Sequence, residues 1–375
     1  MRKRNLLLTA ALFFGVASFT NAQEAKKEKK ISDYVTVGGW VDFQYDYQNE
    51  DSKDELNTFQ IRRARLDVKG QIDKMVEFRL QGDFCNSPAL IDGFVKVKFN
   101  DYINFQAGQF KSPFTIENPY SPLDLELIEN AQVISQLSGY KGKDALTKLE
   151  GEKAGRAIGI SLYGRAFKVE RNGAEFHLLK YDLGIFNGNG INVKDDNFAK
   201  TFVGRLEFYP FLKDLLISGS MYYGTYSAFG EKDTETGETK KYDADKIRYA
   251  VGARYDDGKI MIRSEYLTGK TGIYDEGIND LKNQNSDGVY VSAGYWFTMK
   301  ELMKGLGEQK IRPVIRYDYY RSDVDAENSA SSYYTAGVDW WLQKHLCFKL
   351  DYTYRDVQAK DNARHCIAAQ ISVKF

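Results

Sequence analysis

The stretch Phe59-Gln-Ile-Arg-Arg-Ala-Arg-Leu-Asp-Val-Lys-Gly70 places three arginines in four positions. Successive side chains of an extended strand point to opposite sides, so this run divides into two faces. One face is apolar and consists of Ala64, Leu66 and Val68. The other is fully charged and consists of Arg63, Arg65, Asp67 and Lys69. Arg62 breaks the alternation, and we expect it at the outer rim of the molecule, beyond the apolar zone.

Alternating segments of this kind recur along the whole chain, for example over residues 35–47, 76–84, 247–255 and 346–354. Each is about ten residues long, the length of a transmembrane strand. Counting them predicts an all-β protein with sixteen antiparallel strands. The connections alternate between tight turns, such as 71–74, and long polar loops, such as 48–57, 230–243 and 269–286. Short turns at one end and long loops at the other are typical of outer-membrane β-barrels.

The N-terminal segment reads as a secretory signal peptide. Arg2, Lys3 and Arg4 precede a short apolar stretch over 6–19, and Thr20-Asn-Ala22 supplies small residues before a cleavage point. This stretch is too short to span a bilayer as a helix. We therefore expect residues 1–22 to be a signal peptide, 23–33 a periplasmic N-terminal stub and 34–375 a transmembrane barrel in the bacterial outer membrane.

The composition argues against several other classes of protein. The chain has 52 basic and 52 acidic residues, so its charge gives no reason to expect nucleic acid as a partner. The three cysteines, Cys85, Cys347 and Cys366, form no CxxC motif and no disulfide framework, and the sequence leaves their role open. A soluble β-sandwich also alternates apolar and polar faces. The long strands, with tyrosine and phenylalanine near their ends, favour the barrel.

The final segment, Ile371-Ser-Val-Lys-Phe375, is an amphipathic strand with a terminal aromatic residue. Such an ending resembles the recognition sequence of outer-membrane barrels. With the repeated strands, it predicts the barrel-assembly machinery as a partner that binds through Phe375. An even number of strands places both chain ends in the periplasm.

A series of short motifs resembles the phosphate-selective porin O and P family, in order and spacing, from about residue 35 to residue 375. The motifs are Arg62-Arg-Ala-Arg-Leu66, Asp92-Gly-Phe-Val95, Gly108-Gln-Phe-Lys-Ser-Pro-Phe114, Gly155-Arg-Ala-Ile-Gly159, Phe186-Asn-Gly-Asn-Gly190, Gly204-Arg-Leu206 and Tyr209-Pro-Phe211. The resemblance implies a sixteen-stranded outer-membrane barrel, usually a homotrimer, that prefers anions. It also implies that residues 111–156 form a long inward-folded constriction loop.

The sequence of that loop partly agrees. Ser121 followed by Pro122 is typical of a helix start, with Ser121 as the N-cap. Leu127, Ala131, Ile134 and Leu137 then recur at helical spacing, which predicts an amphipathic helix against the barrel wall. A cap helix outside the pore remains an alternative.

The charged strand faces would line a water-filled lumen, where arginine and lysine favour anions. The candidate pore-lining and anion-binding residues are Arg63, Arg65, Lys96, Lys98, Lys111, Arg205, Arg248 and Arg316. Those expected nearest the constriction are Arg63, Arg65, Lys96 and Lys111. For each of them the alternative is an ion pair with an acidic residue on a neighbouring strand, which would only stiffen the wall.

Catalytic and cofactor chemistry is not expected. The three histidines are His177, His345 and His365, and the last two lie at opposite ends of one predicted hairpin, too far apart to share a metal ion. No GxSxG motif occurs, and no phosphate-binding or dinucleotide motif stands between a strand and a helix. We expect no enzyme, no cofactor and no metal site.

Three functions fit these observations. The first is an outer-membrane porin, a water-filled diffusion channel for small solutes with a preference for anions and with phosphate as a candidate. The second is a weakly selective general or oligosaccharide porin. The third is a structural or adhesive outer-membrane barrel with a plugged lumen. The expected partners are small anionic or neutral solutes, outer-membrane lipid and two further copies of the chain.

Overall fold

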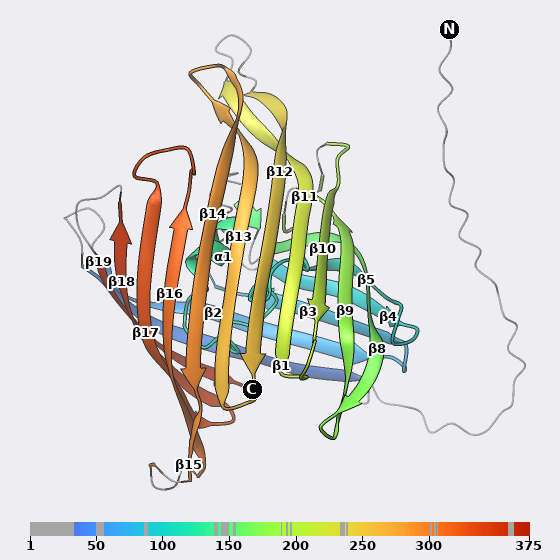
Figure 1. Cartoon of the computed structure of the whole chain (residues 1–375), viewed down its shortest axis with the longest axis vertical. Helices are drawn as coiled ribbons and strands as arrows, with labels where there is room; N and C mark the ends of the chain where they lie inside the picture. The colour runs from blue at the N-terminus through green and yellow to red at the C-terminus, as the bar shows by residue number, and fades with distance from the viewer. Residues whose placement is uncertain are drawn as a thin grey trace, which may run out of the picture.

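The computed structural model describes residues 34–375 apart from 50–55, 86–88, 139–141, 144–149, 153–154, 189, 193, 196, 233–236, 238, 301, 304, 306 and 359–363. The predicted signal peptide and stub, residues 1–22 and 23–33, lie outside the described residues. Antiparallel strands wind around a central space and make up nearly all of the structure (Figure 1). No described helix is long and apolar enough to cross a membrane.

The strands of the barrel are β1 (Val35–Gln48), β2 (Leu56–Gln71), β3 (Val76–Asp83), β4 (Ala89–Lys98), β5 (Asn104–Lys111), β8 (Arg156–Arg171), β9 (Ala174–Phe186), β10 (Thr201–Phe208), β11 (Leu215–Lys232), β12 (Thr239–Asp256), β13 (Ile260–Asp275), β14 (Asp280–Tyr295), β15 (Phe297–Met299), β16 (Gln309–Arg321), β17 (Ala330–Gln343), β18 (Leu346–Val357) and β19 (Arg364–Lys374). Between β5 and β8 lie one helix, α1 (Gln132–Leu137), and two short strands, β6 (Gly142–Lys143) and β7 (Glu150–Glu152).

The sheet closes on itself, which confirms the predicted barrel. Each strand pairs with the next along the chain, and β1 pairs with both β2 and β19. β14 and β15 both pair with β16, so they are two parts of one strand interrupted at Trp296. The seventeen segments of the sheet therefore form a sixteen-stranded barrel. Closure leaves no unpaired sheet edge, as a lipid environment requires.

The two faces of the barrel differ as the alternation predicted. On β13, for example, Ile262 and Tyr266 are 47% and 43% exposed on the outer face. Arg263 and Glu265, which alternate with them, are 3% and 1% exposed. The apolar residues thus face outward, and the charged residues face the interior. This arrangement is the reverse of a soluble protein and matches a barrel in lipid.

The two ends of the barrel carry different connections. One end, which we call the turn end, holds the short connections such as 72–75, 172–173, 257–259 and 344–345. The other, which we call the loop end, holds 49–55, 187–200, 322–329 and 358–363. The predicted long loops over 230–243 and 269–286 are wrong, because β11 to β14 continue through most of both ranges. Strand pairing persists there because backbone hydrogen bonding does not need an apolar face.

Strand length varies around the barrel, and Figure 1 shows the taller part around β11 to β14. β3 and β5 have eight residues each, whereas β11 and β12 have eighteen. The tall strands therefore extend the interior space at the loop end.

A β-bulge in β2 corrects the predicted position of Arg62. Asp42 pairs with Arg63 and Phe43 pairs with Ile61, so Arg62 is an extra residue between two paired positions. Bulges of this kind bend and twist the strand locally and re-aim a side chain. The Arg62 side chain forms an ion pair with Glu129, a residue of the segment inside the barrel, at 3.3 Å. Arg62 is therefore not a rim residue.

The last strand returns the chain to its beginning. The N–H of Phe375 donates to the carbonyl of Gly39, and the N–H of Gly39 donates to the carbonyl of Phe375, both at 3.0 Å. The Phe375 ring is 63% exposed and lies against Gly39, where a Cβ atom would stand 2.7 Å from the ring. Glycine at this position makes room for the terminal aromatic ring.

Candidate functional site

Residues 112–138, which we call the loop segment, follow β5 and bind to the inner face of the opposite strands. The N–H groups of Ile116 and Glu117 donate to Glu265 of β13 at 2.5 and 2.9 Å. The N–H of Ile128 donates to Asp351 of β18 at 2.7 Å. These carboxylates point inward from strands whose alternate residues face outward. The loop segment therefore binds to the inward face of β13 and β18.

Cationic side chains bind the carbonyl groups of the same segment. Lys349 of β18 donates to the carbonyls of Pro122, Leu123 and Leu125. Arg316 of β16 donates to those of Glu129 and Asn130, at 2.8 and 3.3 Å. Buried backbone groups must be satisfied somewhere, and here the barrel wall satisfies them.

These contacts explain why the predicted long helix is wrong. Only the six residues of α1 are helical, and they begin at Gln132 instead of next to Ser121. The Ser121 carbonyl accepts the N–H groups of Asp124 and Leu125, and its hydroxyl accepts that of Leu123 at 3.4 Å, which makes a single turn. Beyond this turn, the backbone groups that a helix would bond internally are bonded to the wall instead.

A buried cluster of opposite charges fixes the middle of the loop segment. Arg263 of β13 donates to Glu117 at 2.7 Å and to Glu126 at 2.6 Å, and all three side chains are almost fully buried. Burial raises the pKa of Glu126, but Arg263, Arg312 and Arg316 outweigh it and lower that pKa to about 2. Glu126 therefore stays charged at neutral pH and holds the loop segment to β13.

The apolar side of α1 completes the attachment. Val133, Ile134 and Leu137 are fully buried and join a cluster with Leu267 and Tyr290 of the wall and with Phe114 of the loop segment. The segment is thus held by hydrogen bonds, ion pairs and apolar contacts together. Most of these contacts are made with β10 to β18, and β2 adds the ion pair between Arg62 and Glu129.

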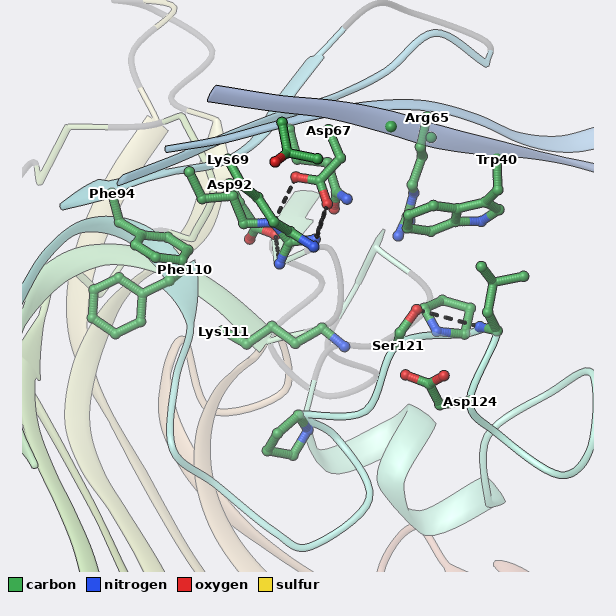
Figure 2. Close-up of a pocket in the computed structure, with 18 of the residues that line it drawn as sticks. Trp40, Arg65, Asp67, Lys69, Asp92, Phe94, Phe110, Lys111, Ser121 and Asp124 are labelled. Atoms are coloured by element: carbon green, nitrogen blue, oxygen red, sulfur yellow. Dashed lines mark hydrogen bonds and ion pairs between the residues drawn. The ribbon is translucent and has the colours of Figure 1, made fainter. Parts of the chain in front are cut away.

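On the opposite side, a cavity of about 700 Å³ separates the loop segment from the wall. We call it the central cavity. It is lined by residues of β1 to β5, β8, β9 and β19, by Phe375 and by residues 119 and 121–124 of the loop segment. Figure 2 shows the Lys111 side chain reaching into this space between Phe110 on one side and Ser121 on the other. Arg65 lies beside the ring of Trp40, with its guanidinium carbon 5.2 Å from the ring centre.

Ion pairs occupy most of the arginines around the central cavity. Arg65 pairs with Asp83 at 2.9 Å, and Arg79 pairs with Asp67 at 2.8 Å. Arg156 and Asp92 are buried together, 2.6 Å apart. Even so, the lining holds six lysines and arginines against four aspartates and Phe375, whose terminal carboxylate adds a fifth negative charge. The cavity is therefore basic overall, and its arginines are held in fixed positions.

The structure brings only two of the eight predicted site residues together at the central cavity, Arg65 and Lys111. Lys98, which pairs with Glu77, and Arg205 both line a second cavity, of about 820 Å³, at the turn end. The NH1 group of Arg205 also donates to the carbonyl of Thr115 in the loop segment at 2.8 Å.

The remaining predicted residues serve the wall itself. Arg63 is buried and pairs with Asp42 at 3.1 Å, and Lys96 lies 5.5 Å from the centres of the Phe94 and Tyr163 rings. Arg248 is fully buried and donates to the Thr271 hydroxyl at 3.2 Å. Arg316 binds the loop segment as described above.

Three contributors to the site were missed in the sequence. Trp40 and Arg156 both line the central cavity, and Arg62 binds Glu129. The alternation from Asp42 backwards places Trp40 on the inner face of β1, so that residue could have been found. Arg156 is the first residue of β8. The predicted loop included this residue, so it was not recognised as part of a strand. The inward position of the Arg62 side chain depends on the bulge, which no local sequence pattern reveals.

A closed sixteen-stranded barrel with an apolar exterior, a charged interior and a segment held inside it defines the porin class of outer-membrane channel. The chain belongs to the phosphate-selective porin O and P family, whose model matches residues 35–375. The family and the fold indicate a channel in the bacterial outer membrane. No match was found among curated protein sequences.

Solved structures share this fold at low sequence identity. The anion-selective porin from Comamonas acidovorans is 14% identical, with a TM-score of 0.61, and the match covers 91% of this chain and 99% of that one. The outer membrane channel DcaP of Acinetobacter baumannii is 12% identical, with a TM-score of 0.58 and coverage of 91% and 97%. Salmonella typhi OmpF, in a complex with daunomycin, is 14% identical, with a TM-score of 0.59 and the same coverage. At these identities the likeness concerns the fold alone.

Proposed function

We propose that this protein is a diffusion channel that passes small solutes and prefers anions, with phosphate as a candidate. The family description and the anion selectivity named for the Comamonas acidovorans porin support this proposal. The excess of cationic side chains around the central cavity supports it independently. Rings of arginine and lysine favour anions in pores of this kind.

The observation that carries the proposal is the environment of Lys111. Its ammonium group reaches into the central cavity and donates to the carbonyls of Asn118 and Tyr120 at 2.7 and 2.6 Å. Among the described residues, no carboxylate lies within ion-pair distance of it. An ammonium has three donors, so one remains for a passing anion. Release stays easy, because a single point charge attracts an anion without enclosing it.

The test is a planar bilayer measurement on the purified protein in a KCl gradient. We expect a reversal potential that indicates preference for chloride over potassium, and we expect inorganic phosphate to reduce the chloride current. Lys111→Met should weaken both effects, while the matched change Lys98→Met, whose partner is Glu77, should alter them little. A wild-type channel that prefers potassium would contradict the proposal.

We further propose that residues 111–156 narrow the pore. The contacts of the loop segment support this for residues 112–138, whereas most of 139–154 lies outside the described residues. A weakly selective channel remains the second candidate, because ion pairs occupy Arg63, Arg65, Arg79 and Arg156. A plugged structural barrel would show no conductance at all, so the same bilayer measurement separates the three.

The remaining proposals concern assembly. We propose that residues 1–22 direct secretion, that the chain acts as a homotrimer and that it has no catalytic activity. The trimer form of Vibrio cholerae OmpT, which shares this fold, supports the second of these. The exposed ring of Phe375 suits recognition by the barrel-assembly machinery. Deleting Phe375 should lower the amount of heat-modifiable, folded protein in outer-membrane fractions, and unchanged assembly would contradict this role.

A further inference from the structure

Two cavities adjoin each other on the loop-end side of α1. The larger has a volume of about 680 Å³ and lies among β11, β13, β14, β16 and β17. The smaller has a volume of about 400 Å³ and lies among β1, β2 and β16 to β19. Gln132, Gln136 and Tyr333 line both of them, so the two cavities adjoin, and together we call them the upper chamber. Each of the two volumes falls within the range of ordinary ligand sites.

The chemistry of the upper chamber differs from that of the central cavity. The larger part is lined by five aromatic residues, four amides and three serines, and Glu276 is the one charged residue among its lining. The aromatic residues are Tyr226, Phe229, Tyr274, Tyr320 and Tyr333. The smaller part holds three acidic and three arginine side chains, which balance. An inorganic anion would find no excess of positive charge here.

Neutral polar groups of the loop segment face this space. Asn130, Gln132 and Ser135 are 4%, 7% and 6% exposed and line the chamber. Both polar atoms of the Asn130 amide, Oε1 of Gln132 and Oγ of Ser135 have no hydrogen-bond partner among the described residues. Buried polar groups without a partner are uncommon, because each costs free energy unless something bonds to it. These four atoms are themselves covered, and what Asn130, Gln132, Ser135 and Gln136 give this side of the chamber is a lining of uncharged polar side chains.

Uncharged donors and acceptors beside aromatic rings suit a solute that is rich in hydroxyl groups. Hydroxyls both donate and accept, and the apolar faces of a sugar ring can cover aromatic surface. A site built to bond hydroxyls discriminates strongly against solutes that lack them. Phosphate alone would leave the rings and most of the amides unused.

We propose that the upper chamber binds the hydroxylated body of a phosphorylated sugar, whose phosphate then enters the basic central cavity. This inference rests on the proposed anion preference and names the class of solute. The loop segment borders both spaces: Asn130, Gln132, Ser135 and Gln136 line the chamber, and residues 119 and 121–124 line the central cavity. A solute with a neutral part and an anionic part therefore meets matching surfaces in sequence.

The experiment compares three probes that reduce the chloride current of single channels: glucose 6-phosphate, inorganic phosphate and glucose. We expect glucose 6-phosphate to halve the current at a concentration about tenfold lower than inorganic phosphate, the effect of one well-made hydrogen bond. Glucose alone should act more weakly than glucose 6-phosphate. Equal potency of glucose 6-phosphate and phosphate would overturn the proposal, and so would equal potency of glucose and glucose 6-phosphate.

Substitutions in the upper chamber test whether the advantage of glucose 6-phosphate over phosphate arises there. Gln132→Leu combined with Gln136→Leu should remove the advantage of glucose 6-phosphate over phosphate and leave the action of phosphate unchanged. Gln343→Leu, an exposed position at the turn end, is the matched control and should change neither. Tyr274→Ala tests the aromatic side separately, in case the double variant fails to insert into the bilayer. An advantage that survives in both Tyr274→Ala and the double variant would overturn the assignment to this chamber.

The same recordings separate this inference from the proposed function. A reversal potential that favours potassium would refute the anion preference, whatever glucose 6-phosphate does. A preference for chloride, together with equal potency of glucose 6-phosphate and inorganic phosphate, would refute only the proposed binding in the upper chamber.

Discussion

The two sides of the lumen use the same residue types in different ways. On β13, β16 and β18, which we call the clamped wall, Arg263, Arg316 and Lys349 are bonded to the loop segment. On β2, β3 and β8, which we call the open wall, Arg65, Arg79 and Arg156 are bonded to neighbouring aspartates and border the central cavity. An inward-facing cation is therefore not in itself a pore residue. Its role depends on whether its partner belongs to the loop or to the wall.

The largest expected effect comes from removing what the clamped wall holds. Deleting residues 121–139 should raise single-channel conductance several-fold, because the loop segment would no longer occupy the lumen. Heat-modifiable migration on a gel would show that the barrel itself still folds. An unchanged conductance in folded protein would mean that the segment does not limit the current.

The second-largest effect is expected when Arg263, a cation of the clamped wall, is replaced by a neutral residue. Arg263→Met leaves Glu117, Glu126 and Glu265 buried without their cation, and breaking a buried pair in this way costs about 3–5 kcal/mol. Thermal unfolding in detergent should show a clear loss of stability, and single channels should become noisier. Lys98→Met is the control, since its partner Glu77 is partly exposed and such pairs contribute about 0–1 kcal/mol. Equal losses of stability in both variants would contradict the distinction between the buried Arg263 cluster and the partly exposed pair of Lys98 and Glu77.

Selectivity should depend on the open wall. Replacing Arg63 and Arg65 together by Ala should shift the reversal potential in a KCl gradient toward cations. The structure assigns most of this shift to Arg65, which borders the cavity, whereas Arg63 is buried with Asp42. The single variants test this division. A shift produced by Arg63→Ala alone would show that the field of a buried cation reaches the solute path.

The smallest effect is expected at the ion pair that joins β2 of the open wall to the loop segment. Arg62 of β2 pairs with Glu129 of the loop segment, and both side chains are just over one quarter exposed. Arg62→Ala should leave ion preference unchanged and increase fluctuations of the open current, because a pair of this kind contributes about 0.2–1 kcal/mol. Glu129→Gln should have the same effect, and the double variant should add little to either change. Fully additive effects would show that the two residues act independently.

Much of the fold could be predicted from the sequence because its main rule is local. An outward residue must be apolar, and an inward residue can be charged. Val37, Val41 and Phe43 therefore show which face of β1 points outward, without any knowledge of the neighbouring strands. The rule weakens where strands leave the apolar zone. Residues 230–232 and 239–243 carry polar side chains on both faces, and their pairing was not visible in the sequence.

The site was harder to predict because its contacts join distant parts of the chain. Ile128 bonds to Asp351 and Gln132 bonds to Asp318, so the path of the loop segment depends on residues 223 and 186 positions away. Helical spacing over 127–137 was correct for the side of α1 that is buried and wrong for the helix length. The positive character of the lumen was visible, but the partner of each cation was not.

The bulge in β2 has a consequence for how the chain tolerates changes in length. Because side chains alternate with a period of two, deleting a residue from an ordinary strand turns one end of it inside out. At Arg62 the opposite holds, since Asp42 would still face Arg63 and Phe43 would still face Ile61 after its removal. This position can be lost while every outward residue stays in lipid. A single-codon deletion there would release the loop from β2 and leave the barrel's membrane surface unchanged.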